Sequence, residues 1–253
     1  MHLLISFSAF PDHPLPLLLA LGAVVLAYGV FTLVGFGSAL MAGGPLAMVM
    51  PVARVIPTLA LLDFVGAVSR GWRGHREVAW GEFFRLVPGM LVGQWLGVLV
   101  LVKLPARAMA VTLGIFIVAQ GLHGLRRRKG AGFLFPWAGV QGLLGGVLGG
   151  LFGSGGFIYA AYLERRLTSR SAFRATQALL IALSTAWRIV LCLGAGLVDR
   201  NLLLTAGALF PAMALGVYAG HHLDLRLKRE QLVWLLNVLL IASGGGLMLR
   251  YLG

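Results

Sequence analysis

The chain has 253 residues, of which 59% are hydrophobic and 11% are charged, and its mean hydropathy is +0.90. A soluble domain carries about a quarter charged residues, so the composition excludes a soluble protein and predicts an integral membrane protein. The formal net charge of +13 does not indicate nucleic-acid binding. The basic residues lie between apolar runs, where they set topology and contact anionic lipid.

Ten apolar segments follow in chain order, five before and five after a basic stretch that begins at Arg126. The second segment of each set is short and begins at a Gly-Ser step, which favours a half-helix or re-entrant piece over a full span. The predicted fold is an all-α integral membrane protein with about 8–10 transmembrane or half-membrane helices and Gly-rich broken segments. The segments lie at approximately 15–34, 37–51, 53–70, 82–102 and 105–123, then 136–151, 154–165, 171–195, 201–220 and 230–249.

Two motifs occur once in each half of the chain. The pattern Pro-x-Met-x-x-Gly-x-x-x-Gly spans 88–97 and returns at 211–220, and Phe-Gly-Ser at 36–38 returns at 152–154. Matching Gly/Pro-interrupted halves in an apolar chain indicate a transporter built from internal repeats. We therefore expect an N-terminal transmembrane repeat over 1–125, a basic cytoplasmic linker over 126–135 and a C-terminal transmembrane repeat over 136–253.

The Lys and Arg residues predict the orientation. If the first two segments of each half form a hairpin, fourteen basic residues collect on one face and only five on the other. By the positive-inside rule the first face is cytoplasmic, so both termini are expected on the extracytoplasmic side. Each half then has an odd number of crossings, which makes the repeats inverted and places a binding site near the midplane. The five outer residues are Arg54, Lys103, Arg107, Arg200 and Arg250.

The Gly-Ser steps are the first candidate binding elements. Glycines let the backbone turn and approach a ligand, serine can cap a helix, and the free N–H groups of a helix N-terminus favour an anion. The alternative is close helix packing through small residues, which fits residues 93–97, 142–150 and 216–220 well. The candidate substrate-binding residues here are Gly37, Ser38, Gly153, Ser154, Gly155 and Gly156.

Two ionisable residues lie inside apolar segments, Arg188 and Asp63. Intramembrane charge is a functional hypothesis by default. Arg188 would be the counter-charge for an anionic substrate, or would snorkel to the interface, or would pair with Asp63 as a structural bridge. Asp63 is a proton-coupling candidate, or it neutralises Arg188 or caps a broken helix. Thr58 and Thr176 occupy similar places in the two halves and are candidate site residues, with hydroxyl back-bonding to the helix as the alternative.

The sequence gives no support for an enzyme, because paired carboxylates, a Ser/His/Asp set and a nucleotide-binding loop are all missing. No cofactor is expected. The stretch at 221–224 (His-His-x-Asp) resembles part of a metal site, but the sequence has no second cluster of ligands to complete it. An interfacial loop is therefore favoured, and no metal is expected. Because a nucleotide-binding loop is missing, any uphill transport must be powered by a gradient.

The chain resembles the TauE/SafE sulfite exporter family, also called the 4-toluene sulfonate uptake family. The resemblance rests on residues 35–46, 149–156 and 165–176 and on the paired Pro-x-Met motifs, and it covers about residues 18–250. It implies gradient-driven transport of sulfite, sulfonates or related organosulfur anions across the bacterial inner membrane. Proline, frequent within the second short helix of the family, is absent from 157–166.

The leading hypothesis is therefore a secondary transporter of a small anion that works by alternating access. A passive anion channel on the same fold and a membrane scaffold that transports nothing are the alternatives. The expected partners are a small anionic substrate and membrane lipid, with no nucleic acid, and a homodimer is one option for assembly.

Overall fold

The computed structural model describes residues 14–34, 37–126, 137–222 and 229–252, and these ranges are helical, with no strand among them. The all-α prediction is confirmed for them, and each expected segment corresponds to one helix. The expected linker lies almost entirely outside the described residues, as does Asp224. The helices are α1 (Pro14–Val34), α2 (Ser38–Val49), α3 (Val52–Gly74), the 3-10 turn η1 (His75–Glu77), α4 (Trp80–Lys103), α5 (Ala106–Arg126), α6 (Ala138–Phe152), α7 (Gly156–Arg166), α8 (Arg170–Gly194), α9 (Arg200–His222) and α10 (Arg229–Leu252).

The helices α2 and α7 are too short to cross a membrane. They have 12 and 11 residues, which at 1.5 Å per residue makes each about 17 Å long against about 30 Å of hydrocarbon. Each follows a glycine with left-handed backbone, Gly37 with φ 100° and Gly153 with φ 70°. Side chains with a Cβ are disfavoured at such angles, so the glycines allow the chain to stop one helix and start another inside the protein.

The glycine stripes of α4 and α6 pack the two helices in close contact. Gly93 and Gly97 on α4 face the backbone of α6, while Gly146 and Gly150 on α6 face the backbone of α4. A Cβ at Gly97 would lie 2.5 Å from the carbonyl oxygen of Val147, so no larger side chain fits without a shift. Small residues let helix backbones approach in this way in membranes, and the packing alternative is confirmed for these glycines.

The second copy of the motif packs in the same way on a different partner. Gly216 and Gly220 of α9 face the carbonyl oxygens of Val25 and Gly29 in α1. The first copy thus joins α4 to the first helix of the C-terminal half, and the second joins α9 to the first helix of the N-terminal half. The aromatic residue of each copy points outward instead, with Trp95 49% and Tyr218 62% exposed, as expected for side chains that face lipid.

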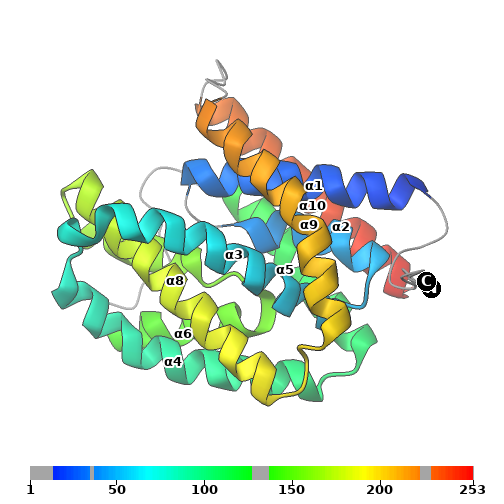
Figure 1. Cartoon of the computed structure of the whole chain (residues 1–253), viewed down its shortest axis with the longest axis horizontal. Helices are drawn as coiled ribbons and strands as arrows, with labels where there is room; N and C mark the ends of the chain where they lie inside the picture. Colours follow the sequence, from blue (N-terminus) through cyan, green and yellow to red (C-terminus); the bar gives the residue numbers. More distant parts are fainter. Residues whose placement is uncertain (1–13, 35–36, 127–136, 223–228, 253) are drawn as a thin grey trace, which may run out of the picture.

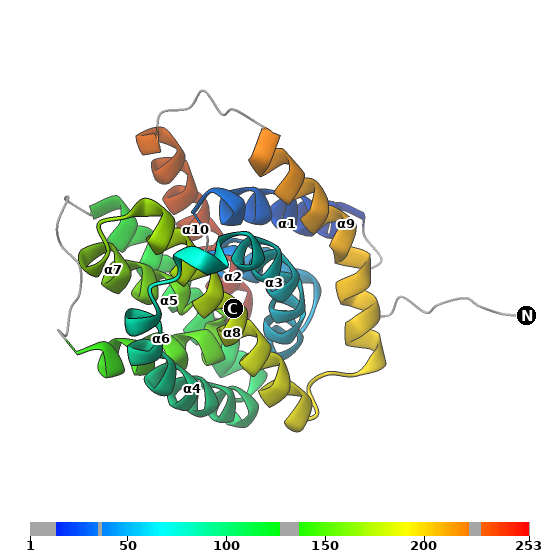
Figure 2. The same cartoon turned by 60° about the vertical axis from the view of Figure 1, so that its left-hand side comes forward.

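The two halves interleave around a central pair, α3 and α8, which pack against each other. Figures 1 and 2 show α4 beside α6 and α1 beside α9. The short helix α2 packs on α1 and α3, and its counterpart α7 packs on α6 and α8. Each of these contacts has a counterpart when the first five helices are exchanged with the last five. The two short helices, α2 and α7, therefore each pack against one helix of the central pair.

Four helices in the described part of the chain are long and apolar enough to span a membrane. They cover Trp80–Lys103, Ala106–Leu125, Arg170–Gly194 and Arg200–Gly220, and shorter apolar stretches cover Leu18–Thr32 and Ala138–Phe152. With the half-length α2 and α7, this agrees with a multi-pass membrane protein that contains broken segments.

Candidate functional site

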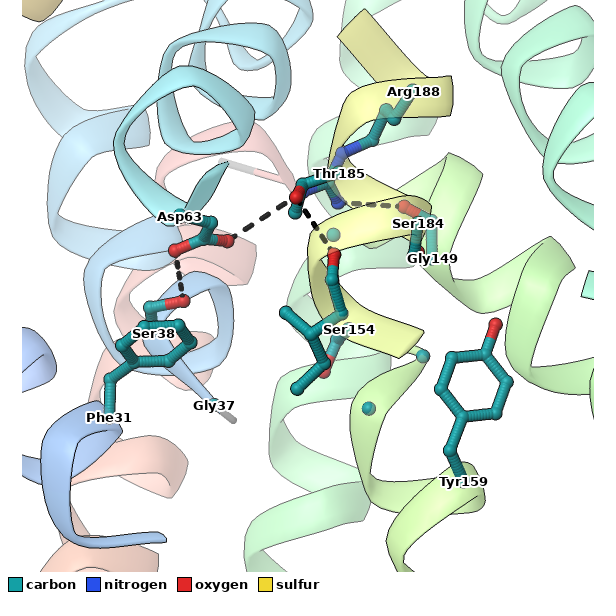
Figure 3. A pocket seen from close by; sticks show the side chains of 14 residues that line it. Phe31, Gly37, Ser38, Asp63, Gly149, Ser154, Tyr159, Ser184, Thr185 and Arg188 are labelled. Atoms are coloured by element: carbon teal, nitrogen blue, oxygen red, sulfur yellow. Dashed lines mark hydrogen bonds and ion pairs between the residues drawn. The ribbon is translucent and has the colours of Figure 1, made fainter. Parts of the chain in front are cut away.

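A small cavity, lined mostly by buried residues, lies between the beginnings of α2 and α7 and the middle of the central helix pair. Its volume, about 20 Å³, is enough for a water molecule, so an oxyanion requires the cavity to widen. Figure 3 shows Asp63 and Ser38 on one side and Ser184 and Tyr159 on the other, with Arg188 above. The lining residues are Phe31, Gly37, Ser38, Asp63, Gly149, Gly153, Ser154, Gly155, Gly156, Tyr159, Ile181, Ser184, Thr185 and Arg188.

The structure brings most of the candidate residues to this cavity. All six Gly-Ser residues of the two breaks line it, although the breaks are more than a hundred residues apart in the chain. Both charged candidates, Asp63 and Arg188, line it as well. A single cavity thus combines two helix N-termini with a buried cation and a buried carboxylate.

The beginnings of α2 and α7 supply backbone donors. The first intrahelical bond of α2 runs from Met41 N to Gly37 O (3.2 Å), and the corresponding bond at α7 runs from Ile158 N to Gly155 O (3.1 Å). The first N–H groups of a helix have no partner within it, and together with the helix dipole they favour an anion. Side chains do not cap either helix, so serine capping, the role considered from the sequence, is not what Ser38 and Ser154 do here.

Ser38 instead binds Asp63, because the first residue of α2 faces the middle of α3. The Ser38 hydroxyl donates to Asp63 Oδ1 (2.6 Å), and the Tyr28 hydroxyl of α1 donates to the same oxygen (2.8 Å). The other carboxylate oxygen, Oδ2, lies 3.6 Å from Arg188 Nη2. The carboxylate is 3% exposed, and these three groups stabilise its negative charge away from water.

Arg188 reaches the cavity from α8. Its Nη1 donates to the carbonyl oxygen of Gly149 (2.9 Å), near the end of α6, and its Nη2 faces Asp63. The guanidinium is 2% exposed, so it does not snorkel to an interface. Its Nε has no hydrogen-bond partner among the described residues. The Nε–H group of the arginine is therefore available to a ligand, and an anion and Asp63 compete for the same cation.

Thr58 and Thr176 do not line the cavity. The Thr58 hydroxyl donates to the carbonyl oxygen of Arg54 one turn earlier (2.7 Å), which is the back-bonding alternative. The Thr176 hydroxyl accepts from the backbone N–H of Ala79 (2.9 Å), the residue that caps α4. Both hydroxyls bond backbone groups of helices, and we leave both residues out of the proposed site.

Several residues that line the cavity or bond a lining residue were not singled out from the sequence. Tyr28 bonds Asp63, Gly149 bonds Arg188, and Tyr159 and Ser184 form the wall opposite Ser38. Gln94 links α4 to α8: its Nε2 donates to Ser184 O (2.8 Å) and Oγ (3.1 Å). One sequence signal was available, since Tyr159 is a polar aromatic residue one turn after a Gly-Ser break.

Groups of three or more His, Cys, Asp or Glu that could hold a metal ion are not found among the described residues. The polar groups at the cavity are mostly hydrogen-bond donors: backbone N–H groups, hydroxyls and a guanidinium. Such an arrangement suits a small oxyanion better than a cation.

Comparisons with known proteins point the same way. The family model described as "Sulfite exporter TauE/SafE" matches residues 19–247. A relative from Comamonas testosteroni, described as "Probable inner membrane transporter protein TsaS", is 30% identical over 187 residues, which cover 73% of this chain and 78% of the relative. No solved structure gives a significant match to the chain. The matching family and this relative are membrane transporters rather than enzymes.

Proposed function

The chain belongs to the TauE/SafE sulfite exporter family and is a membrane transporter, and from this premise we propose that it carries sulfite, a sulfonate or a related organosulfur anion. Transport is gradient-driven and crosses the bacterial inner membrane. The observation that carries the proposal is the meeting of two half-helix N-termini and the buried Arg188 at one cavity.

The donors at the cavity fit an acidic group with three terminal oxygens. Three separate sets of donors line the cavity: the beginning of α2, the beginning of α7 and the guanidinium of Arg188. Sulfite and the sulfonate group each have three terminal oxygens, so every donor set finds an acceptor. A carboxylate is planar and has only two oxygens, so it cannot present a separate oxygen to each of the three donor sets.

Alternating access by two inverted repeats is the proposed mechanism. It is supported by the repeated motifs and by matching helix contacts, since α4 packs on α6 as α9 packs on α1, and α2 packs on α1 and α3 as α7 packs on α6 and α8. The repeats correspond to the halves 1–125 and 136–253. Because the cavity holds little more than water, rocking of one repeat against the other must open it before an anion can enter or leave.

Asp63 is the proposed proton-coupling residue. An anion that binds Arg188 takes the cation away from Asp63, and a proton on the carboxylate then offsets the charge left behind. The substrate anion and one proton would therefore cross together, which links flux to the proton gradient.

The proposal is tested by charge movement in proteoliposomes on a solid-supported membrane. The panel is sulfite, sulfate, thiosulfate, taurine, sulfoacetate and acetate, each with and without a pH gradient, and electroneutral movement is followed by isotope uptake. We expect a saturable signal for a sulfur anion that Arg188→Gln abolishes. Saturable flux that no gradient can drive uphill would make the protein a passive channel, and no flux from folded, inserted protein would favour a scaffold.

A further inference from the structure

We propose that Tyr159 is an anion-binding residue whose hydroxyl donates to the substrate oxygen held at the beginning of α7. This inference rests on the proposed function and adds a residue to its site. Tyr159 is 1% exposed and lines the cavity, and its hydroxyl has no hydrogen-bond partner in the described part of the chain. Figure 3 shows the hydroxyl end pointing toward Ser184 and Gly149.

The backbone geometry explains why the hydroxyl lies where an anion would bind. Tyr159 is the fourth residue of α7, and side chains on a helix lean toward its N-terminus. A Cβ added at Gly155, which precedes α7, would lie 3.2 Å from the Tyr159 hydroxyl oxygen. The phenol is therefore beside the free N–H groups at the beginning of the helix, and both donor types can meet one oxygen of a ligand.

The surrounding chain makes room for this ring. A Cβ at Gly145 in α6 would collide with the Tyr159 ring, so the glycine there lets the ring pack against α6. The ring belongs to a core cluster with Leu86, Met90 and Leu163. Phenylalanine would fill the same space, whereas tyrosine adds a buried hydroxyl that no described protein group bonds, and a buried hydroxyl without a partner is unfavourable. A ligand that accepts its proton in a hydrogen bond removes this penalty.

The test compares Tyr159→Phe with Tyr162→Phe. Tyr162 lies one turn further along the same helix, is also buried, and bonds Glu82 (2.5 Å) outside the cavity. Half-saturating concentration and maximal rate for sulfite are measured in proteoliposomes, and melting temperature is measured without anion. We expect Tyr159→Phe to raise the half-saturating concentration about 10- to 150-fold, the range for a hydrogen bond to a charged partner. Tyr162→Phe should leave it unchanged.

Melting temperature separates a binding role from a structural one. Without anion, Tyr159→Phe should melt at or above the wild-type temperature, because a buried hydroxyl without a partner is removed. A clear loss of stability would mean that the hydroxyl serves the fold, and an unchanged half-saturating concentration would mean that it does not touch the anion; either result overturns the inference. A wild-type protein that moves none of the anions would remove the proposed function itself, and this inference with it.

Discussion

Replacing Asp63 by asparagine should make the protein depend on its anion for stability. Asp63 is the buried counter-ion of Arg188, with Oδ2 3.6 Å from Nη2. Removing one partner of a buried ion pair costs about 3–5 kcal/mol. At about 2–4 °C per kcal/mol for a chain near this length, Asp63→Asn should melt about 6–20 °C below the wild type without anion.

Sulfite should recover much of this loss, because a bound anion restores a negative charge beside Arg188. At about 100 times Kd, binding contributes about 2.7 kcal/mol. The gain in Asp63→Asn should exceed the wild-type gain, because the anion no longer competes with a carboxylate. Arg188→Gln also leaves one buried charge unpaired and should be destabilised similarly, but sulfite should not rescue it.

The assay is thermal unfolding of detergent-purified protein over a sulfite titration, with chloride held at constant ionic strength. Asp199→Asn is the matched control: Asp199 pairs with Arg54 at 2.8 Å, but both side chains are about 40% exposed. An exposed pair contributes about 0–1 kcal/mol, so this variant should lose little and respond to sulfite like the wild type. Equal sulfite gains in Asp63→Asn and Arg188→Gln would refute the argument that the anion and Asp63 share one cation.

Three further predictions concern the elements around the site. Gly93→Ala should destabilise by about 1–3 kcal/mol in thermal unfolding, because its Cβ would collide with the backbone of α6; an unchanged melting temperature would contradict the close packing. Gly153→Ala should raise the half-saturating sulfite concentration more than Gly37→Ala. Both have positive φ, but only at Gly153 would a Cβ lie 2.9 Å from Arg188 Nη1; equal effects in a flux assay would count against this. Thr176→Val should lower stability by about 1 kcal/mol and leave sulfite affinity unchanged, and a change in affinity would return this residue to the site.

The sequence was most informative where one residue type satisfies a backbone requirement. The left-handed turns at Gly37 and Gly153 and the packing of Gly93 and Gly216 each need the absence of a Cβ. Only glycine meets these requirements without strain, so the breaks and the close-packed helices could be located from the glycine positions in the sequence. The lengths of the apolar runs gave the helices in the same way, because a membrane sets their length.

The direction of individual side chains could not be predicted in the same way. Thr58 and Thr176 are at similar places in the two halves, yet one hydroxyl donates within its own helix and the other accepts from the N-cap of α4. A hydroxyl can bond locally or across helices at similar energy, so sequence leaves the choice open. The position of Tyr159 could not be predicted because it depends on how α7 packs against α6, where the Tyr159 ring lies against Gly145.

The ion pair of Arg188 and Asp63 could be predicted only in part. Burial of Arg188 and Asp63 in apolar segments predicted that they matter, and pairing was one of the alternatives. The structure adds that the pair lines the same cavity as both Gly-Ser breaks. The structural bridge and the substrate counter-charge are then compatible, because an anion can replace Asp63 beside Arg188.

The most direct test of the account is to locate a bound oxyanion. Selenite has the three-oxygen shape of sulfite and a selenium atom that anomalous X-ray diffraction identifies. We expect one anomalous peak at the cavity, between the beginnings of α2 and α7 and beside Arg188, which is weakened in crystals of Arg188→Gln. Selenite bound in some other part of the protein, with this cavity empty at concentrations that saturate transport, would contradict the account.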